Sequence, residues 1–154
     1  MDLPALLEAI AADLRTLLGS RAAVVDVHAG RFTAAELRRY ATRAPAVLLA
    51  CLRVSDLDQA GEHRQSASLN LAAFVITTDR DGTPRASVAL DLAGRVLAAL
   101  SLRTWPGIDA REQRAIDPDT AEATNLYAAD LDTQGVALWA VSWRQTFTLT
   151  PPEA

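Results

Sequence analysis

The stretch that decides the fold is GVALWAVSWRQTFTLT, residues 135–150. From Val136 onward it contains neither Gly nor Pro, and small or β-branched residues alternate with bulky ones. This period of two predicts a β-strand rather than a helix. A strand over 136–149 exceeds the usual strand length, because most strands have about five or six residues. A domain of this size does not need such a strand for its core alone, and we expect part of it to serve assembly.

Two long amphipathic helices are predicted on either side of the chain's middle. Over 1–19 and again over 84–102, apolar residues recur at spacings of three and four. Asp2 is placed to cap the first helix, and Gly19 to end it. A shorter helix is expected within 30–42, where Thr33 and Glu36 have the spacing of a capping box; apolar or alternating runs predict strands over 22–28, 46–56 and 63–78.

This order of elements predicts one α+β domain over 1–154. We expect a mainly antiparallel sheet with the two long helices packed on one of its faces. The last strand and the helical stripes supply the candidate core residues, which are Leu14, Leu92, Trp139 and Val141.

The composition is that of an ordinary globular protein, with a net charge of −4. All 15 basic residues are Arg, and the acidic total argues against a protein that grips nucleic acid by its phosphates. The sequence has no apolar run of membrane-spanning length, and its acidic, amphipathic N-terminus does not resemble a secretory signal. We therefore expect a protein made in the cytoplasm and not held in a membrane.

Little in the sequence indicates chemistry. His28 and His63 lack metal-site spacing, and Cys51 lies in an apolar run where a buried, inert thiol is expected. Residues 79–83 (DRDGT) resemble the start of a calcium loop, but position twelve is Leu90 rather than Glu. A turn into the following helix, with Asp81 or Thr83 near the helix cap, is therefore favoured. Paired acids recur at 56/58, 117/119 and 130/132 beside turn residues. We expect no catalytic, cofactor or metal site, and no enzyme.

The tryptophans allow two interpretations. Trp139 and Trp143 fall on the same face of the last strand, either as a core stripe or as an aromatic anchor at a subunit boundary, where Trp and Arg are enriched. Trp105, in a loop, is either a lid over the core edge or an exposed anchor. We expect the Trp139 end to be core and the later part of the strand to meet a neighbour. The candidate interface residues are Arg103, Trp105, Trp143, Arg144 and Phe147.

The chain resembles the Mu-like phage tail-terminator family, related in fold to the terminators of other long-tailed phages. The resemblance rests on the order of segments that cover most of the chain. These are LLEAIAADLRTLL, FTAAELRRYATRAPAVLLACL, LNLAAFVITTDRDG, RASVALDLAGRVLAAL and NLYAADLDTQGVALWAVSWRQTFTL.

The resemblance implies a structural virion protein with no active site. It implies a ring of six copies at the head-proximal end of the tail, bound to the tail tube protein on one face and to the head–tail connector on the other. Such a ring stops tube polymerisation, and DNA crosses its lumen without sequence-specific binding. An acidic subunit fits such a channel, since like charges repel.

Other functions stay open at this stage. A tail-completion or head–tail connector protein of similar size is the nearest alternative. A small α+β enzyme or ligand-binding domain is a second, against which the missing nucleophile and phosphate loop count. A nucleic-acid-binding module is a third, disfavoured by the charge.

Overall fold

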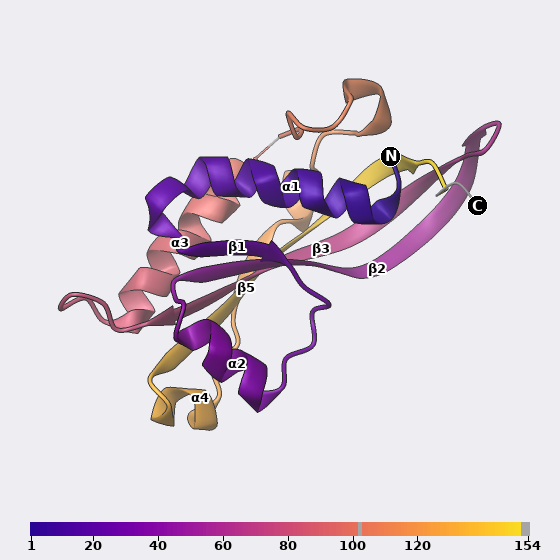
Figure 1. Cartoon of the computed structure of the whole chain (residues 1–154). Coiled ribbons are helices and arrows are strands. Elements are labelled where there is room, and N and C mark those ends of the chain that lie inside the picture. The colour runs from indigo at the N-terminus through magenta and orange to yellow at the C-terminus, as the bar shows by residue number, and fades with distance from the viewer. Residues whose placement is uncertain (102, 152–154) are drawn as a thin grey trace.

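The computed structural model describes residues 1–101 and 103–151, which form an α+β fold (Figure 1). Its five-stranded sheet has the order β1–β2–β3–β5–β4, in which β1 and β2 are parallel and the other neighbours are antiparallel. The strands are β1 (Val24–Val27), β2 (Ala46–Gly61), β3 (Arg64–Thr78), β4 (Glu122–Asn125) and β5 (Val136–Leu149). The helices are α1 (Leu3–Leu18), α2 (Ala34–Ala41), α3 (Arg85–Ala99) and α4 (Ala129–Thr133), with 3₁₀ turns at Gly19–Arg21, Ala110–Glu112 and Pro118–Thr120.

The long C-terminal strand lies inside the sheet. Every residue of β5 from Val136 to Leu149 has a partner on β3, from Thr78 back to Gln65. On its other side, β5 pairs with the short β4 over four residues only. The length of β5 is therefore matched by β3, and together these two strands carry the sheet.

Successive side chains of β3 and β5 point to opposite faces of the sheet, and each face carries its own hydrophobic core. Side chains on one face pack under α1 and α3, and those on the other face pack against α2 and α4 (Figure 1). Leu14, Leu92 and Val141 belong to the first core. The fold class predicted from the sequence, with a mainly antiparallel sheet and two long helices on one face, is confirmed. The short helices on the opposite face add a second layer.

Both long helices are shorter than their predicted ranges. Asp2 accepts a hydrogen bond from the Ala5 N–H at the start of α1, and the chain leaves the helix at Gly19, which has a positive φ of 55°. α3 ends at Ala99, and the next residue closes a tighter, 3₁₀-type turn in which the Leu100 N–H donates a hydrogen bond to the Leu97 carbonyl. The predicted end of that helix, Leu102, and the last residues of the predicted domain, 152–154, lie outside the described residues.

The cap of α2 is only half of the predicted capping box. Thr33 Oγ1 accepts from the Glu36 N–H at 3.1 Å, as expected. The Glu36 carboxylate is instead hydrogen-bonded to His28 Nε2 at 2.7 Å. His28 Nδ1 accepts a hydrogen bond from the Gly30 N–H. Glu36 thus ties α2 to the end of β1 rather than closing its own helix.

The two faces of α3 provide a test of this packing. Leu92 is buried in the first core, whereas Leu90, two residues earlier, is 55% exposed. Leu92→Ala should lower the free energy of unfolding by about 2–5 kcal/mol, because it leaves a cavity in the core. Leu90→Ala should change it by less than about 0.5 kcal/mol. Chemical denaturation of both variants measures the difference, and equal costs would contradict the assigned orientation of α3.

Candidate assembly surface

Three of the residues expected at a subunit boundary lie in the core instead. Trp105, Trp143 and Phe147 are at most 2% exposed. The rings of Trp105 and Trp143 contact each other, with centroids 6.1 Å apart and a tilt of 43°. They are buried because the loop after α3 folds back over this end of β5. A side chain enclosed in this way by its own chain offers no surface to a neighbour, so the interface expected at these residues must be corrected.

The order of burial along β5 is also the reverse of what was expected. Trp139 is only partly buried and packs at the edge of the first core, whereas Val141 and Trp143 are fully inside it. Trp139 lies near β4 and α4, beside a small pocket that Leu126 and Tyr127 also line. The Trp139 end of the strand is therefore nearer the surface on this face.

Two buried glutamines fasten the loop to the strand. The Trp105 N–H donates to Gln113 Oε1 at 2.7 Å, and Gln113 Nε2 donates to the carbonyls of Trp105 and Ile108. On β5, Gln145 Oε1 accepts from Trp105 Nε1 at 2.9 Å, and its Nε2 donates to the Arg114 carbonyl. Each buried amide is thus paired, as burial of polar groups requires. A glutamine on the apolar face of β5 was the sequence signal of this network.

The two candidate arginines remain at the surface. Arg144 is exposed and forms an ion pair with Asp56, at the register shift of β2 between Ser55 and Asp58. Arg103 is half-buried and lines an open pocket between α1 and α3 with Leu17 and Arg95. Their role in an interface stays a prediction.

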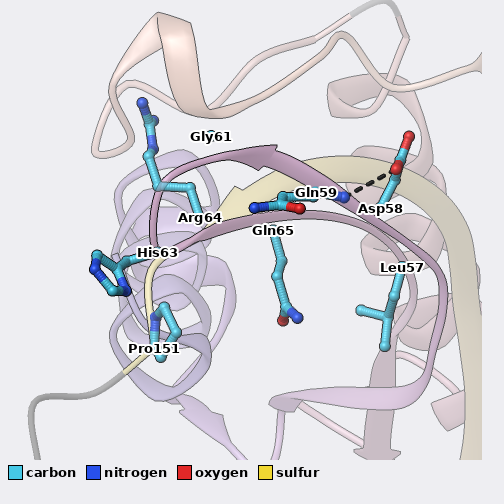
Figure 2. Close-up of a pocket in the computed structure, with 8 residues that line it drawn as sticks. All are labelled: Leu57, Asp58, Gln59, Gly61, His63, Arg64, Gln65 and Pro151. Atoms are coloured by element: carbon cyan, nitrogen blue, oxygen red, sulfur yellow. Dashed lines mark hydrogen bonds between the residues drawn. The ribbon is translucent and has the colours of Figure 1, made fainter.

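The outer half of the β2–β3 hairpin extends past the end of α1 (Figure 1). β2 is buried through Ala50 and almost wholly exposed after Cys51, and its register against β3 shifts at three places. Near the tip is an open pocket of about 340 Å³, in which Leu57 and Gln65 point to one side of the hairpin and Arg64 to the other (Figure 2). The hairpin tip offers apolar and polar contact area rather than an enclosed site.

The sheet has two open edges. β1 covers β2 only as far as Leu49, and β4 has no strand on its outer side in the described part of the chain. Five of the seven large apolar side chains that are exposed in 1–101 and 103–151 lie at these edges. They are Leu52, Val54 and Leu57 on β2, and Leu126 and Tyr127 after β4. Sequence reasoning missed them because strand order is not visible in a local pattern.

Residues considered for chemistry have structural partners. Asp79 accepts from the Arg85 N–H at 2.8 Å and caps the turn into α3, a position expected nearer Asp81 or Thr83. Cys51 is only half-buried, which corrects the expectation of a buried thiol, and this burial raises the pKa of the thiol and so disfavours the thiolate form. Within the described ranges, no three His, Cys, Asp or Glu side chains are grouped so as to hold a metal ion.

None of the helices over the described residues combines the length and the apolar character needed to cross a bilayer.

Comparison with known proteins gives structural likenesses only, among them a distant one. The sequence matches no protein-family model, and no curated protein matches it. Among solved structures, the chain is similar to one described as the sheath/tube terminator of the extracellular contractile injection system PVC in its extended state, at 15% identity and a TM-score of 0.33. The match covers 100% of this chain and 61% of that one, so this chain spans less than two thirds of its length. Such a likeness assigns neither function nor partners, and the Mu-like family remains a resemblance of sequence.

The burial of Trp143 can be tested by measuring how its substitution changes the stability of the subunit. Trp143→Ala should lower the free energy of unfolding by about 3–5 kcal/mol, because a buried aromatic side chain is lost. Arg144→Ala, at the next residue, removes an exposed ion pair and should cost at most about 1 kcal/mol. Urea denaturation followed by circular dichroism measures both. A Trp143→Ala variant with normal stability but impaired assembly would restore the original interface assignment.

We also expect the hydrogen bonds of Gln113 to stabilise the folded subunit. Gln113→Ala leaves three buried backbone groups of Trp105 and Ile108 without their partner, and it should destabilise the subunit by about 1–3 kcal/mol. Gln59→Ala, at an exposed position of the hairpin, is the matched control and should leave the unfolding midpoint unchanged. If Gln113→Ala behaves like the control, the loop does not depend on this network.

Proposed function

We propose that this chain is a structural virion protein that forms a ring of six copies on the end of a phage tail tube. In that position it stops tube polymerisation and provides the surface that joins the tail to the head connector. The proposal combines the resemblance of sequence with one observation, which is the concentration of exposed apolar side chains along the two open edges of the sheet.

That distribution suits a subunit that assembles. A ring closes through heterologous contacts, in which one patch of each subunit meets a different patch of its neighbour. Opposite edges of one sheet provide two such patches. Exposed apolar groups gathered in patches mark sites of interaction, whereas scattered ones are normal on any surface.

The net negative charge of the subunit suits a ring that lets DNA pass through its lumen without binding it. Net charge is −4, and binding to the phosphate backbone would need an excess of Lys and Arg directed at it. An acidic ring repels DNA that crosses its lumen and so avoids trapping it. Reversal of lumen-facing Asp and Glu side chains should retain DNA in transit and lower infectivity. Unchanged infectivity would count against this role for the charge.

The particle itself provides the direct test of the ring. The purified chain should have a mass in solution of six times 16.5 kDa, and negative-stain images should show six-fold rings with a central hole. A monomer at every concentration tested, with no rings on tail tubes either, would overturn the proposal.

A functional assay separates the terminator from the head–tail connector. Added to tail tube protein during polymerisation, the chain should bind at one end of each tube and limit tube growth. A connector protein would instead bind empty heads and leave tube length unchanged. The ratio of capped tubes to occupied heads, counted by electron microscopy, decides between the two functions.

A further inference from the structure

We propose that the ring closes by placing the open edge of β2, residues 52–57, beside β4 of the next subunit, a second copy of this chain. The inference rests on the proposed ring and names the two surfaces that build it. The two edges lie at opposite sides of one sheet, so each subunit would use β2 toward one neighbour and β4 toward the other.

The backbone at both edges is available for pairing. β1 ends its pairing with β2 at Leu49, and in the described structure Arg53–Ser55 pair with β3 on one side and with no strand on the other. Over the described ranges, β4 is paired with β5 on its inner side and with no strand on its outer side. An edge of this kind presents unpaired N–H and C=O groups that favour a further strand.

Strand direction suits this contact. Each of the pairs β2–β3, β3–β5 and β5–β4 is antiparallel, so β2 and β4 run in opposite directions within one subunit. A neighbour repeated in the same orientation around a ring therefore brings its β4 antiparallel to β2. The bulges of β2 on either side of Arg53–Ser55 limit the contact to a short stretch, and β4 is itself four residues long.

Apolar side chains flank the two edges. Leu52 is 53% exposed and Leu57 is 62% exposed on β2, while Tyr127, just after β4, is 69% exposed. A tyrosine at the centre of a contact is a frequent source of binding energy, because its ring buries a large area at low entropic cost. More than half of the surface of each of these side chains is exposed within the described subunit, and the proposed contact would cover it.

Charges at the two edges are opposite. On the β2 edge, Arg53 is exposed and makes no ion pair within the described residues. At the opposite edge, β4 and the turn before it carry three exposed acidic residues that also make no ion pair within the described residues: Asp117, Asp119 and Glu122. Arg53 is paired with Asn70 and Glu122 with Ser142, so both side chains leave the sheet on the face of α2 and α4. A register that places Arg53 opposite Glu122 of the neighbour brings two opposite charges together on this face. Such complementarity sets partner and orientation more than affinity.

Chemical cross-linking tests the contact if the linker spans about 13 Å, because a register with Arg53 opposite Glu122 leaves residues 55 and 124 about four residues apart along the edge. In a Cys51→Ser background, Ser55→Cys and Thr124→Cys place one thiol on each edge and on the same face of the sheet. With a bis-maleimide of that span, the double variant should give a ladder of covalent species up to six chains. Each single variant should stay uncross-linked, because a heterologous contact keeps identical residues apart. Covalent dimers from the Ser55→Cys variant alone would mean that β2 meets β2, and would overturn the proposal.

Charge reversal tests which groups meet. Arg53→Glu should raise the concentration needed for half-assembly by about tenfold or more, and Arg53→Glu combined with Glu122→Arg should restore assembly. Leu90→Ser, at an exposed apolar position on α3, is the control and should assemble normally. Thermal unfolding of each variant confirms that the subunit is intact, since all these positions are at the surface.

The outcomes separate this inference from the ring itself. If the chain forms no ring, the proposed function fails. If rings form but the double-cysteine variant gives no ladder and Arg53→Glu assembles normally, the ring stands and the edge contact is wrong. If Arg53→Glu forms rings that no longer cap tail tubes, the β2 edge meets the tube protein instead, which also overturns the inference.

Discussion

The structure depends on the antiparallel pairing of β3 with β5 along their full length. This ladder runs from Gln65 opposite Leu149 to Thr78 opposite Val136. Because side chains alternate across a strand, one ladder supplies apolar residues to both faces at once. Two helical layers can therefore pack on a single sheet, with α1 and α3 on one face and α2 and α4 on the other.

At the outer end of this ladder, the loop after α3 takes the place of a further strand. Gln113 forms an isolated bridge with Phe147, and the Arg114 N–H donates to the Thr146 carbonyl. The loop thereby covers the edge of β5 that β4 leaves free and brings Trp105 onto Trp143. The glutamine hydrogen bonds make this irregular segment part of the core. Among the residues that the structure describes, no comparable segment covers the outer half of β2, and this asymmetry leaves that part of the sheet edge open.

Much of the fold could be predicted from local sequence. Helix starts at Asp2 and Thr33 follow capping chemistry, and the stripe that includes Leu14 and Leu92 identifies the buried helix faces. The candidate surface was much less predictable. Trp143 and Arg144 are adjacent in sequence and were expected to act together, yet one is core and the other is exposed, because strand neighbours point to opposite faces.

The sequence by itself determined that 136–149 is a strand and which residues share each of its faces, because period two is a local property of the chain. Only the tertiary structure decided how deeply each of those residues is buried. Burial at Trp143 depends on a loop whose own pattern is weak and which is held by hydrogen bonds between residues far apart in sequence. Strand order, which comes from long-range pairing, likewise decided that β4 and the part of β2 beyond Leu49 are open edges of the sheet.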